Sequence, residues 1–193
     1  ELRVLETRVA LMKGWAGHTA GQFAFVTYDQ SEGAHPYTIA SAWNPEERRI
    51  TFITKALGDH TGVLHEKLKA GTPVTIEGPY GCFDFDDSPA RQIWIGAGIG
   101  ITPFVARMKE LANRKAIGPV DLFHSTAVRD QVAIDKLTAD AEAAGVRLHL
   151  IESGKDSRLD ASQIRAAVPE WKEASFWFCG PPGFGQALRR DLT

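Results

Sequence analysis

The stretch from Ile93 to Met108, IWIGAGIGITPFVARM, contains the residues best suited to hold a phosphate group. Three apolar residues suit a buried strand, and three glycines follow at alternate positions: Gly96, Gly98 and Gly100. Thr102 then has the residue type of a helix N-cap, and Pro103 suits the first helical position. Such a strand–turn–helix unit brings backbone N–H groups and the positive end of a helix dipole to an anion. A tight turn that needs small residues and binds no ligand is the alternative.

Two further stretches place polar or reactive residues after expected strands. HSTAVRD, residues 124–130, follows one strand, and CGPPGFG, residues 179–185, follows another. The second motif leaves Cys179 at a strand tip before Gly180 and Pro181, although a simple capping turn would also explain it. Ligands of doubly wound sheets bind outside the carboxyl ends of the strands. We therefore expect the glycine motif and these two stretches to meet at one edge of a sheet.

The first half of the chain has two more candidate binding motifs. HPYTIAS, residues 35–41, places the aromatic ring of Tyr37 and the hydroxyl of Thr38 in an expected strand. GDHTGVL, residues 58–64, places Asp59, His60 and Thr61 where a short helix should begin. A helix start of this kind is a second position suited to a phosphate group.

The residue pattern divides into two halves that would position these motifs. Before about residue 88 the pattern is one of short strands, expected at 2–11, 23–28, 37–41, 48–55 and 73–77, with one helix at 61–69. This pattern predicts a small antiparallel β-barrel.

From Ile93 onward, strands and helices alternate. The strands are expected at 93–95, 120–125, 146–151 and 176–179, and the helices from 102, at 132–144 and 162–167, and from about 183. Alternation predicts an α/β doubly wound parallel sheet. The acidic, proline-bearing segment FDFDDSPARQ between the halves suggests two domains, residues 1–88 and 89–193.

Composition excludes several classes of function. The net charge of −2 over 193 residues gives no reason to expect nucleic acid or an anionic membrane surface as a main partner. Two distant cysteines cannot form a disulfide framework or an iron–sulfur cluster. The six histidines lack metal-site spacing, so we expect no metal site. The longest uncharged run, residues 92–106, is too short to span a bilayer.

Six motifs in order, AGQF, HPYTIAS, GDHT, EGPYG, GAGIGITP and CGPPGF, resemble those of the ferredoxin–NADP reductase superfamily. The resemblance covers nearly the whole chain and is closest to the flavin-reductase portion of the ferric reductase and NADPH oxidase branch. It implies an FAD-binding barrel followed by an NAD(P)H-binding domain. It also implies that hydride passes from the nicotinamide to flavin N5.

The resemblance also implies roles for individual residues. Tyr37 matches the aromatic that stacks on the isoalloxazine, and Thr38 the hydroxyl that bonds near flavin N5. The FAD set implied is His35, Pro36, Tyr37, Thr38, Ile39, Ala40, His60 and Thr61, the last two at the pyrophosphate. The set implied at the NAD(P)H pyrophosphate and nicotinamide is Gly98, Gly100, Thr102, Pro103, Cys179, Gly180 and Pro181. The residues nearest the reacting atoms are Thr38, Thr102 and Cys179. His35 stands where many members have arginine, which leaves less fixed positive charge for the flavin phosphate.

The expected end of the second parallel strand bears on the choice of dinucleotide. NAD-selective sheets place an acidic residue there to hold the ribose 2′-hydroxyl. This chain instead has Ser125 and Thr126, with Arg129 following and no acid before Asp130. Hydroxyls and an arginine suit a 2′-phosphate. We therefore expect NADPH to be preferred, with NADH possible. A solvent-facing Arg129 is the alternative.

The chain begins inside a strand pattern, and it lacks the first and the final strands of the family. The second domain is therefore expected to be C-terminally incomplete. We expect the dehydrogenase part of a larger membrane protein, on the cytoplasmic face, that passes electrons toward a haem-containing transmembrane domain. Two alternatives stay open: a soluble NAD(P)H reductase that serves a ferredoxin or an oxygenase, and a non-catalytic subunit that binds nucleotide or docks a partner.

Overall fold

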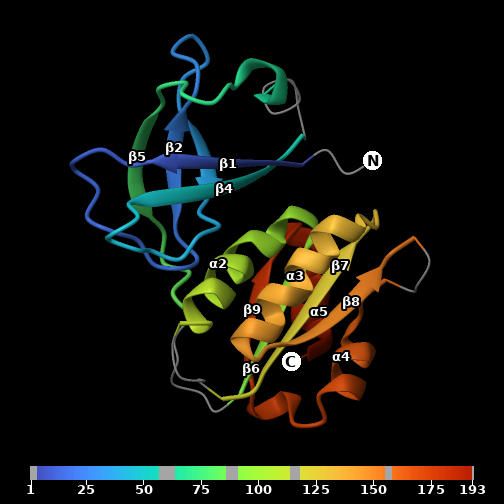
Figure 1. Cartoon of the computed structure of the whole chain (residues 1–193). Coiled ribbons are helices and arrows are strands. Elements are labelled where there is room, and N and C mark those ends of the chain that lie inside the picture. Colours follow the sequence, from blue (N-terminus) through green and yellow to red (C-terminus); the bar gives the residue numbers. More distant parts are fainter. Residues whose placement is uncertain (1–3, 57–63, 86–90, 114–117, 155–157, 193) are drawn as a thin grey trace.

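The computed structural model describes residues 4–56, 64–85, 91–113, 118–154 and 158–192 (Figure 1). His60 and Thr61, both expected at the FAD pyrophosphate, lie outside the described residues, as does the centre of the expected domain boundary. Residues 64–67 are helical, in agreement with the second half of the helix expected at 61–69.

The first half of the chain is built from five antiparallel strands. One sheet has the order β3-β2-β5, from His35–Thr38, Phe23–Thr27 and Thr75–Tyr80, and a second pairs β1 (Val4–Ala10) with β4 (Arg49–Lys55). A bridge between Ile39 and Phe52 links the two sheets. The side chains of Ala24, Val26 and Ile50 fill the space between the sheets with those of the bridge. The strands thus enclose one core in barrel-like fashion, as predicted.

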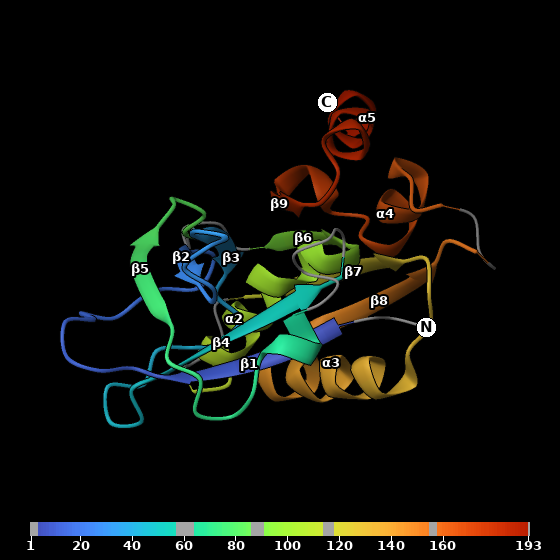
Figure 2. The same ribbon diagram turned by 90° about the horizontal axis from the view of Figure 1, so that it is seen from above.

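The second half is a four-stranded parallel sheet in the order β8-β7-β6-β9. Its strands are β6 (Gln92–Ala97), β7 (Val120–Thr126), β8 (Arg147–Glu152) and β9 (Ser175–Cys179). Helices α2 (Thr102–Leu111) and α3 (Gln131–Ala144) cover one face, and α4 (Ala161–Ala167) and α5 (Pro182–Leu192) cover the other, as Figure 2 shows from above. Two 3-10 turns, η1 (Gly98–Ile101) and η2 (Trp171–Glu173), complete it. The predicted doubly wound sheet is confirmed.

The helices of this half begin and end at recognisable signals. The Asp130 carboxylate accepts a hydrogen bond from the Ala133 amide at 3.0 Å and caps the start of α3. Gly145 ends that helix with a φ of 67°, a left-handed conformation that glycine adopts without steric cost. At the start of α4, Asp160 and Gln163 form a reciprocal capping box. Caps of this kind explain why the helix boundaries agree with the sequence pattern.

Thr102 is not the N-cap that its residue type predicted. The chain is already helical before it, because η1 runs directly into α2, and the cap position falls on Ile101 without a side-chain bond. The buried Thr102 hydroxyl instead donates to the Ile99 carbonyl at 2.8 Å. The cause is Gly98, whose φ of 57° turns the chain into η1 earlier than expected.

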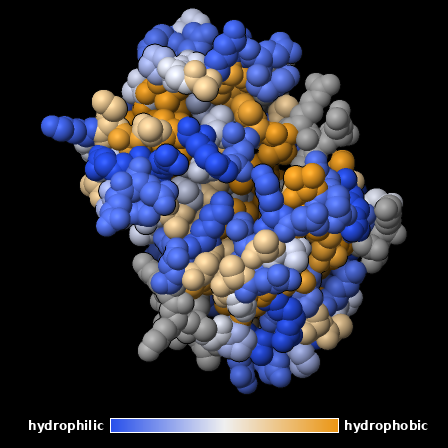
Figure 3. Space-filling model, viewed as in Figure 1, coloured by the Kyte–Doolittle hydropathy of each residue, from blue (hydrophilic) through white to orange (hydrophobic). Residues whose placement is uncertain are grey.

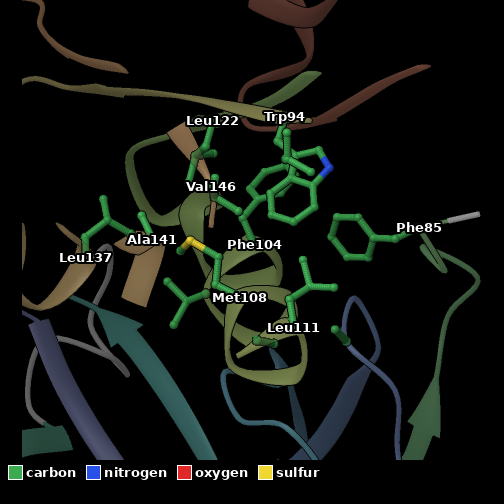
Figure 4. Close-up of a cluster of buried hydrophobic side chains, with 13 residues drawn as sticks. Phe85, Trp94, Phe104, Met108, Leu111, Leu122, Leu137, Ala141 and Val146 are labelled. Atoms are coloured by element: carbon green, nitrogen blue, oxygen red, sulfur yellow. The ribbon is translucent and has the colours of Figure 1, made fainter. Parts of the chain in front are cut away.

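The two halves share one hydrophobic core, which is centred on α2 (Figure 4). Phe104, Met108 and Leu111 of this helix pack with Trp94 of β6. From the first half, Phe85 and Ala20 join the same cluster, and Ile53 packs against it. The helix that follows the glycine motif is therefore also the contact between the halves.

The outer surface has no single large apolar face in the view of Figure 3, where hydrophobic side chains lie in small groups between hydrophilic ones. Among the described residues, no helix is both long and apolar enough to span a membrane.

Two histidines are buried, one in each half. His18 Nε2 lies 3.0 Å from the Ser41 carbonyl, and the Trp15 indole N–H donates to His18 Nδ1. His124 Nδ1 lies 3.0 Å from the Gly96 carbonyl. Burial lowers the pKa of both imidazoles below the usual value of 6.5. Both side chains are therefore neutral in the folded protein at pH 7.

We expect acid to destabilise the protein through these histidines. Above pH 6.5 both are neutral whether the chain is folded or not. Below it the unfolded chain takes up protons that the folded chain resists, so this stability is lost as the pH falls toward the folded pKa values. The free energy of unfolding from urea titrations should fall by up to about 1.4 kcal/mol per pH unit for each histidine.

His124→Asn keeps an N–H donor for the Gly96 carbonyl and removes the titrating group, so its pH dependence should be shallower. The exposed position of His65 supplies the control, His65→Asn. Equal slopes for the parent and His124→Asn would show that His124 contributes nothing.

Candidate functional site

The carboxyl ends of the parallel strands bring the three expected motifs together. In the register of the sheet, Gly96 of β6 lies beside His124 of β7 and beside Cys179 of β9. One residue later, Ala97 lies beside Ser125. The expectation that GAGIG, HSTAVRD and CGPPGFG share one edge is confirmed.

The glycine loop (GAGIG, residues 96–100) and the cysteine loop (CGPPGFG, residues 179–185) contact each other through backbone atoms. A Cβ atom on Gly100 would lie 2.2 Å from the Cys179 carbonyl oxygen and 3.1 Å from the Gly180 nitrogen. A Cβ on Gly180 would lie 2.8 Å from the Ala97 side chain. Real Cβ atoms do not approach so closely, so each position requires glycine. Both loops meet between β6 and β9, the switch point where doubly wound sheets bind their ligands.

Gly98 serves this edge in a different way from Gly100. A Cβ atom there would meet no heavy atom within 4 Å, yet the φ of 57° is one that side-chain-bearing residues rarely adopt. Space is therefore open above the first turn of η1. The first N–H groups of a helical segment have no carbonyl partner within it and can bind an anion.

Cys179 stands at the tip of β9, as predicted, but its thiol is not activated. It is partly buried, and burial raises its pKa above the usual value of 9.0. No cationic neighbour contributes to that shift, although such a neighbour is what makes a reactive thiolate. Cys179 can therefore shape the edge as a neutral, polarisable group rather than act as a nucleophile.

His124, the first residue of HSTAVRD, has a role at the site that sequence reasoning did not assign. Because a carbonyl only accepts, Nδ1 of the neutral imidazole donates to the Gly96 oxygen at 3.0 Å. The bond fixes the Gly96 carbonyl near the carboxyl end of β6, where the glycine loop begins. A histidine inside a strand gave no local signal of this contact, because its partner lies 28 residues earlier.

Two of the three residues expected to bind a 2′-phosphate, Thr126 and Arg129, already have partners within the protein. The Thr126 hydroxyl donates to the Val128 carbonyl at 2.9 Å and so belongs to the turn after β7. Arg129 forms an ion pair with Glu152, the last residue of β8. Thr126 and Glu152 are register partners at adjacent strand ends. The acid that the local sequence lacked is thus supplied by the next strand, and Ser125 is the remaining half-buried hydroxyl.

The predicted flavin strand, β3, presents alternate residues on opposite sides. Tyr37 points into the barrel core, where it is 8% exposed, with its ring edge-on to Tyr28 at 5.6 Å and tilted against Phe52 at 6.0 Å. Burial raises its pKa to about 12. Thr38 is half-buried, and no residue in the described part of the chain hydrogen-bonds with its hydroxyl. A ligand can therefore reach Thr38 more readily than Tyr37.

The rest of the HPYTIAS motif is held by backbone bonds. The Ile39 amide donates to the Gln22 carbonyl at 3.0 Å, and the Ala40 amide donates to the Thr51 carbonyl at 2.8 Å. Both side chains are fully buried. Pro36 is exposed and His35 half-buried. The segment that follows β3 is thus held by backbone hydrogen bonds. The Thr38 hydroxyl, by contrast, has no hydrogen-bond partner among the described residues.

These features fit the two implied cofactors. For a dinucleotide, the structure provides the backbone start of η1, the open space over Gly98 and the cysteine loop beside them. For a flavin, it provides the Thr38 hydroxyl, which has no hydrogen-bond partner among the described residues, beside a segment held by backbone bonds. Among the described residues, no group of three or more His, Cys, Asp and Glu side chains could hold a metal ion.

Comparison with known sequences gives a domain family for the first half of the chain and relatives for most of it. Residues 3–83 match the model of an FAD-binding domain family. An NADPH oxidoreductase of Mycobacterium tuberculosis is 32% identical over 78% of this chain and 41% of its own length. A flavohemoprotein of Deinococcus radiodurans is 30% identical over 81% of this chain and 42% of its own length. The chain thus spans less than half the length of these relatives.

Solved structures share the fold of nearly the whole chain. The FAD/NAD-binding domain of a nitric oxide dioxygenase from Vibrio cholerae superposes with a TM-score of 0.81 at 20% identity, over 98% of this chain and 86% of that one. A ferredoxin–NADP+ reductase from Plasmodium falciparum reaches 0.78 at 17% identity, over 98% and 82%. Residues 3–83 of this chain thus match an FAD-binding domain family, and nearly the whole chain has the two-part fold of ferredoxin reductase-like proteins.

Proposed function

We propose that this chain is the reductase module of a flavoprotein that takes hydride from NAD(P)H onto FAD and hands electrons singly to a separate acceptor. Residues 1–88 would bind FAD, and residues 89–193 would bind the dinucleotide. The observation that carries the proposal is the contact of Gly100 with the Cys179 carbonyl, because it brings the two loops together at the switch point, where doubly wound sheets bind nucleotides. FAD, when bound, supplies the chemistry, since a flavin accepts hydride and can release electrons one at a time.

The residues of the chain would position the flavin and the dinucleotide rather than take part in the reaction themselves. Thr38 would offer a hydrogen bond at the reacting edge of the flavin, and the η1 backbone would hold the pyrophosphate of the dinucleotide. Thr102 would act through the turn that its hydroxyl ties to Ile99. Cys179, neutral at pH 7, would pack against the nicotinamide.

Two classes of electron acceptor are candidates. A haem is one candidate, since relatives of this chain are described as flavohemoproteins. An oxygenase is another, since a glycine betaine monooxygenase reductase subunit of Chromohalobacter salexigens is 25% identical over 81% of this chain. These descriptions favour a reductase module with a haem or oxygenase partner over a ferric reductase anchored at the membrane. Membrane-spanning helices elsewhere in the complete gene would reverse that preference.

A non-catalytic docking subunit is the third candidate, from a different class. It would purify without colour and retain no added FAD. The uncommitted Thr38 hydroxyl and the open turn at Gly98 argue against it, because a docking protein has no use for either.

Thr38→Val should slow reduction of bound FAD by NADPH in anaerobic stopped-flow experiments. It removes one hydrogen bond and keeps the shape of the side chain. Because a neutral hydrogen bond is worth about 0.5–1.5 kcal/mol, the loss should be roughly two- to tenfold. Thr75→Val, at an exposed position of β5, is the matched control. A Thr38→Val protein with the parent's rate would remove Thr38 from the site.

Arg129→Ala should reduce the preference for NADPH, measured as the ratio of kcat/KM for NADPH to that for NADH. A charge-assisted bond to a 2′-phosphate is worth about 1.5–3 kcal/mol, part of which is spent on separating Arg129 from Glu152. The ratio should therefore fall roughly tenfold. Arg147→Ala, at the other end of β8, should leave it unchanged. Equal kcat/KM values in the parent would contradict the preference itself.

Without its acceptor, the isolated chain should reduce ferricyanide or a tetrazolium dye slowly, and oxygen more slowly still. Steady-state assays with NADPH and each acceptor test this expectation. Oxygen reduction as fast as dye reduction would identify an oxidase that needs no further partner.

A further inference from the structure

We propose that α2 is a strut that fixes the end of β3 relative to the glycine loop, and that Lys109 and Glu110 are positioning residues for hydride transfer. The inference rests on the proposed function and adds residues that none of the motifs contains. Helix α2 begins where η1 ends and lies between the two halves (Figure 1).

The far end of α2 holds the first half at two points. Its ten residues carry the chain about 15 Å from the glycine loop. There the Lys109 ammonium donates to the Ala40 carbonyl at 3.4 Å, and the Glu110 carboxylate accepts from the Ala20 amide at 2.9 Å. Ala40 lies two residues after Thr38, where β3 ends. One contact is therefore made to the segment that directly follows the flavin strand.

The second contact acts through the loop of residues 17–22. On one side of Ala20, the Gln22 carbonyl accepts from the Ile39 amide at 3.0 Å. On the other side, the neutral His18 ring donates from Nε2 to the Ser41 carbonyl at 3.0 Å. The loop thus lies bound along the end of β3, and a carboxylate that holds Ala20 also holds that strand.

The two contacts at the end of α2, made by Lys109 and Glu110, together form what we call the clasp. Its carboxylate belongs to a buried ion pair. Glu110 and Arg107 side chains are 9% and 6% exposed, and Arg107 Nη1 lies 2.9 Å from the second carboxylate oxygen of Glu110. The Arg107 guanidinium stands 5.6 Å from the centre of the Phe85 ring. Both carboxylate oxygens of Glu110 are therefore committed, one within α2 and one across the halves. Buried ion pairs are weak sources of stability but directional ones, so the arrangement suits positioning better than adhesion.

Positioning is a chemical requirement of the proposed reaction. Hydride transfer needs the donor carbon and the acceptor nitrogen in contact, and a misplacement of about 1 Å can cost roughly a hundredfold in rate. The glycine loop sets one partner and the end of β3 sets the other. Loosening the clasp should therefore slow the transfer step while each half still binds its own cofactor.

The experiment compares Lys109→Met and Glu110→Met, which remove the donor and the acceptor, with Lys136→Met. Lys136 of α3 also reaches across the halves, but to Glu6 of β1 at 3.7 Å, away from β3. The rate of FAD reduction by saturating NADPH should fall about tenfold in the first two variants, with dissociation constants for FAD and NADP+ within about twofold of the parent. Lys136→Met should match the parent, and Lys109→Arg, which keeps a donor, should restore most of the rate.

Hydrogen exchange of the protein without cofactor gives a readout independent of activity. Glu110→Met should speed exchange of the Ala20 and Ile39 amides, and Lys136→Met should not. Unchanged protection in folded Glu110→Met overturns the inference, as does faster exchange with an unchanged transfer rate. A parent that binds FAD but is not reduced by NADPH refutes the proposed function instead, and the exchange arm still decides whether α2 holds β3.

Discussion

The contact of residue 100 with the Cys179 carbonyl is the constraint on which the rest of the ligand edge depends. With any side chain at this position, the turn after β6 would have to leave the tip of β9, because a Cβ would lie 2.2 Å from that oxygen. Moving the turn would move η1 and therefore the start of α2. Since α2 packs on the other half of the molecule and Lys109 contacts the Ala40 carbonyl, a change at one glycine would also shift the segment that follows β3.

The two edges of the parallel sheet differ in how their polar groups are satisfied. At the amino edge, the buried Asp121 carboxylate contacts Arg91 at 2.9 Å, His149 at 2.8 Å and Arg147 at 3.4 Å. Charge there is compensated within the protein. At the carboxyl edge, by contrast, a Cβ atom at Gly98 would meet open space, and η1 begins there. A sheet that satisfies its polar groups at one end can leave them available at the other.

Periodicity and turn residues were enough to predict nearly every strand and helix in the described part of the chain. The meeting of three distant motifs also followed from one topological rule about strand ends. What these local signals did not show were contacts that form only in the folded chain. Arg129 was interpreted beside its own strand, but its partner Glu152 lies 23 residues on. The burial of Tyr37 depended on Tyr28 and Phe52, and the cap expected at Thr102 was displaced by the earlier turn at Gly98.

Lys109 and Glu110 show a further limit of sequence reasoning. Charged residues near the end of an amphipathic helix are usually a solvated face, and nothing local distinguishes these two. Their partners lie 69 and 90 residues earlier. Apolar packing of Phe85 and Leu111 attracts the two halves, but such contacts are non-directional and would permit small rotations. Two polar contacts at separate points remove that freedom. Because the cofactors supply the chemistry, the orientation of one half against the other is what remains for this chain to provide.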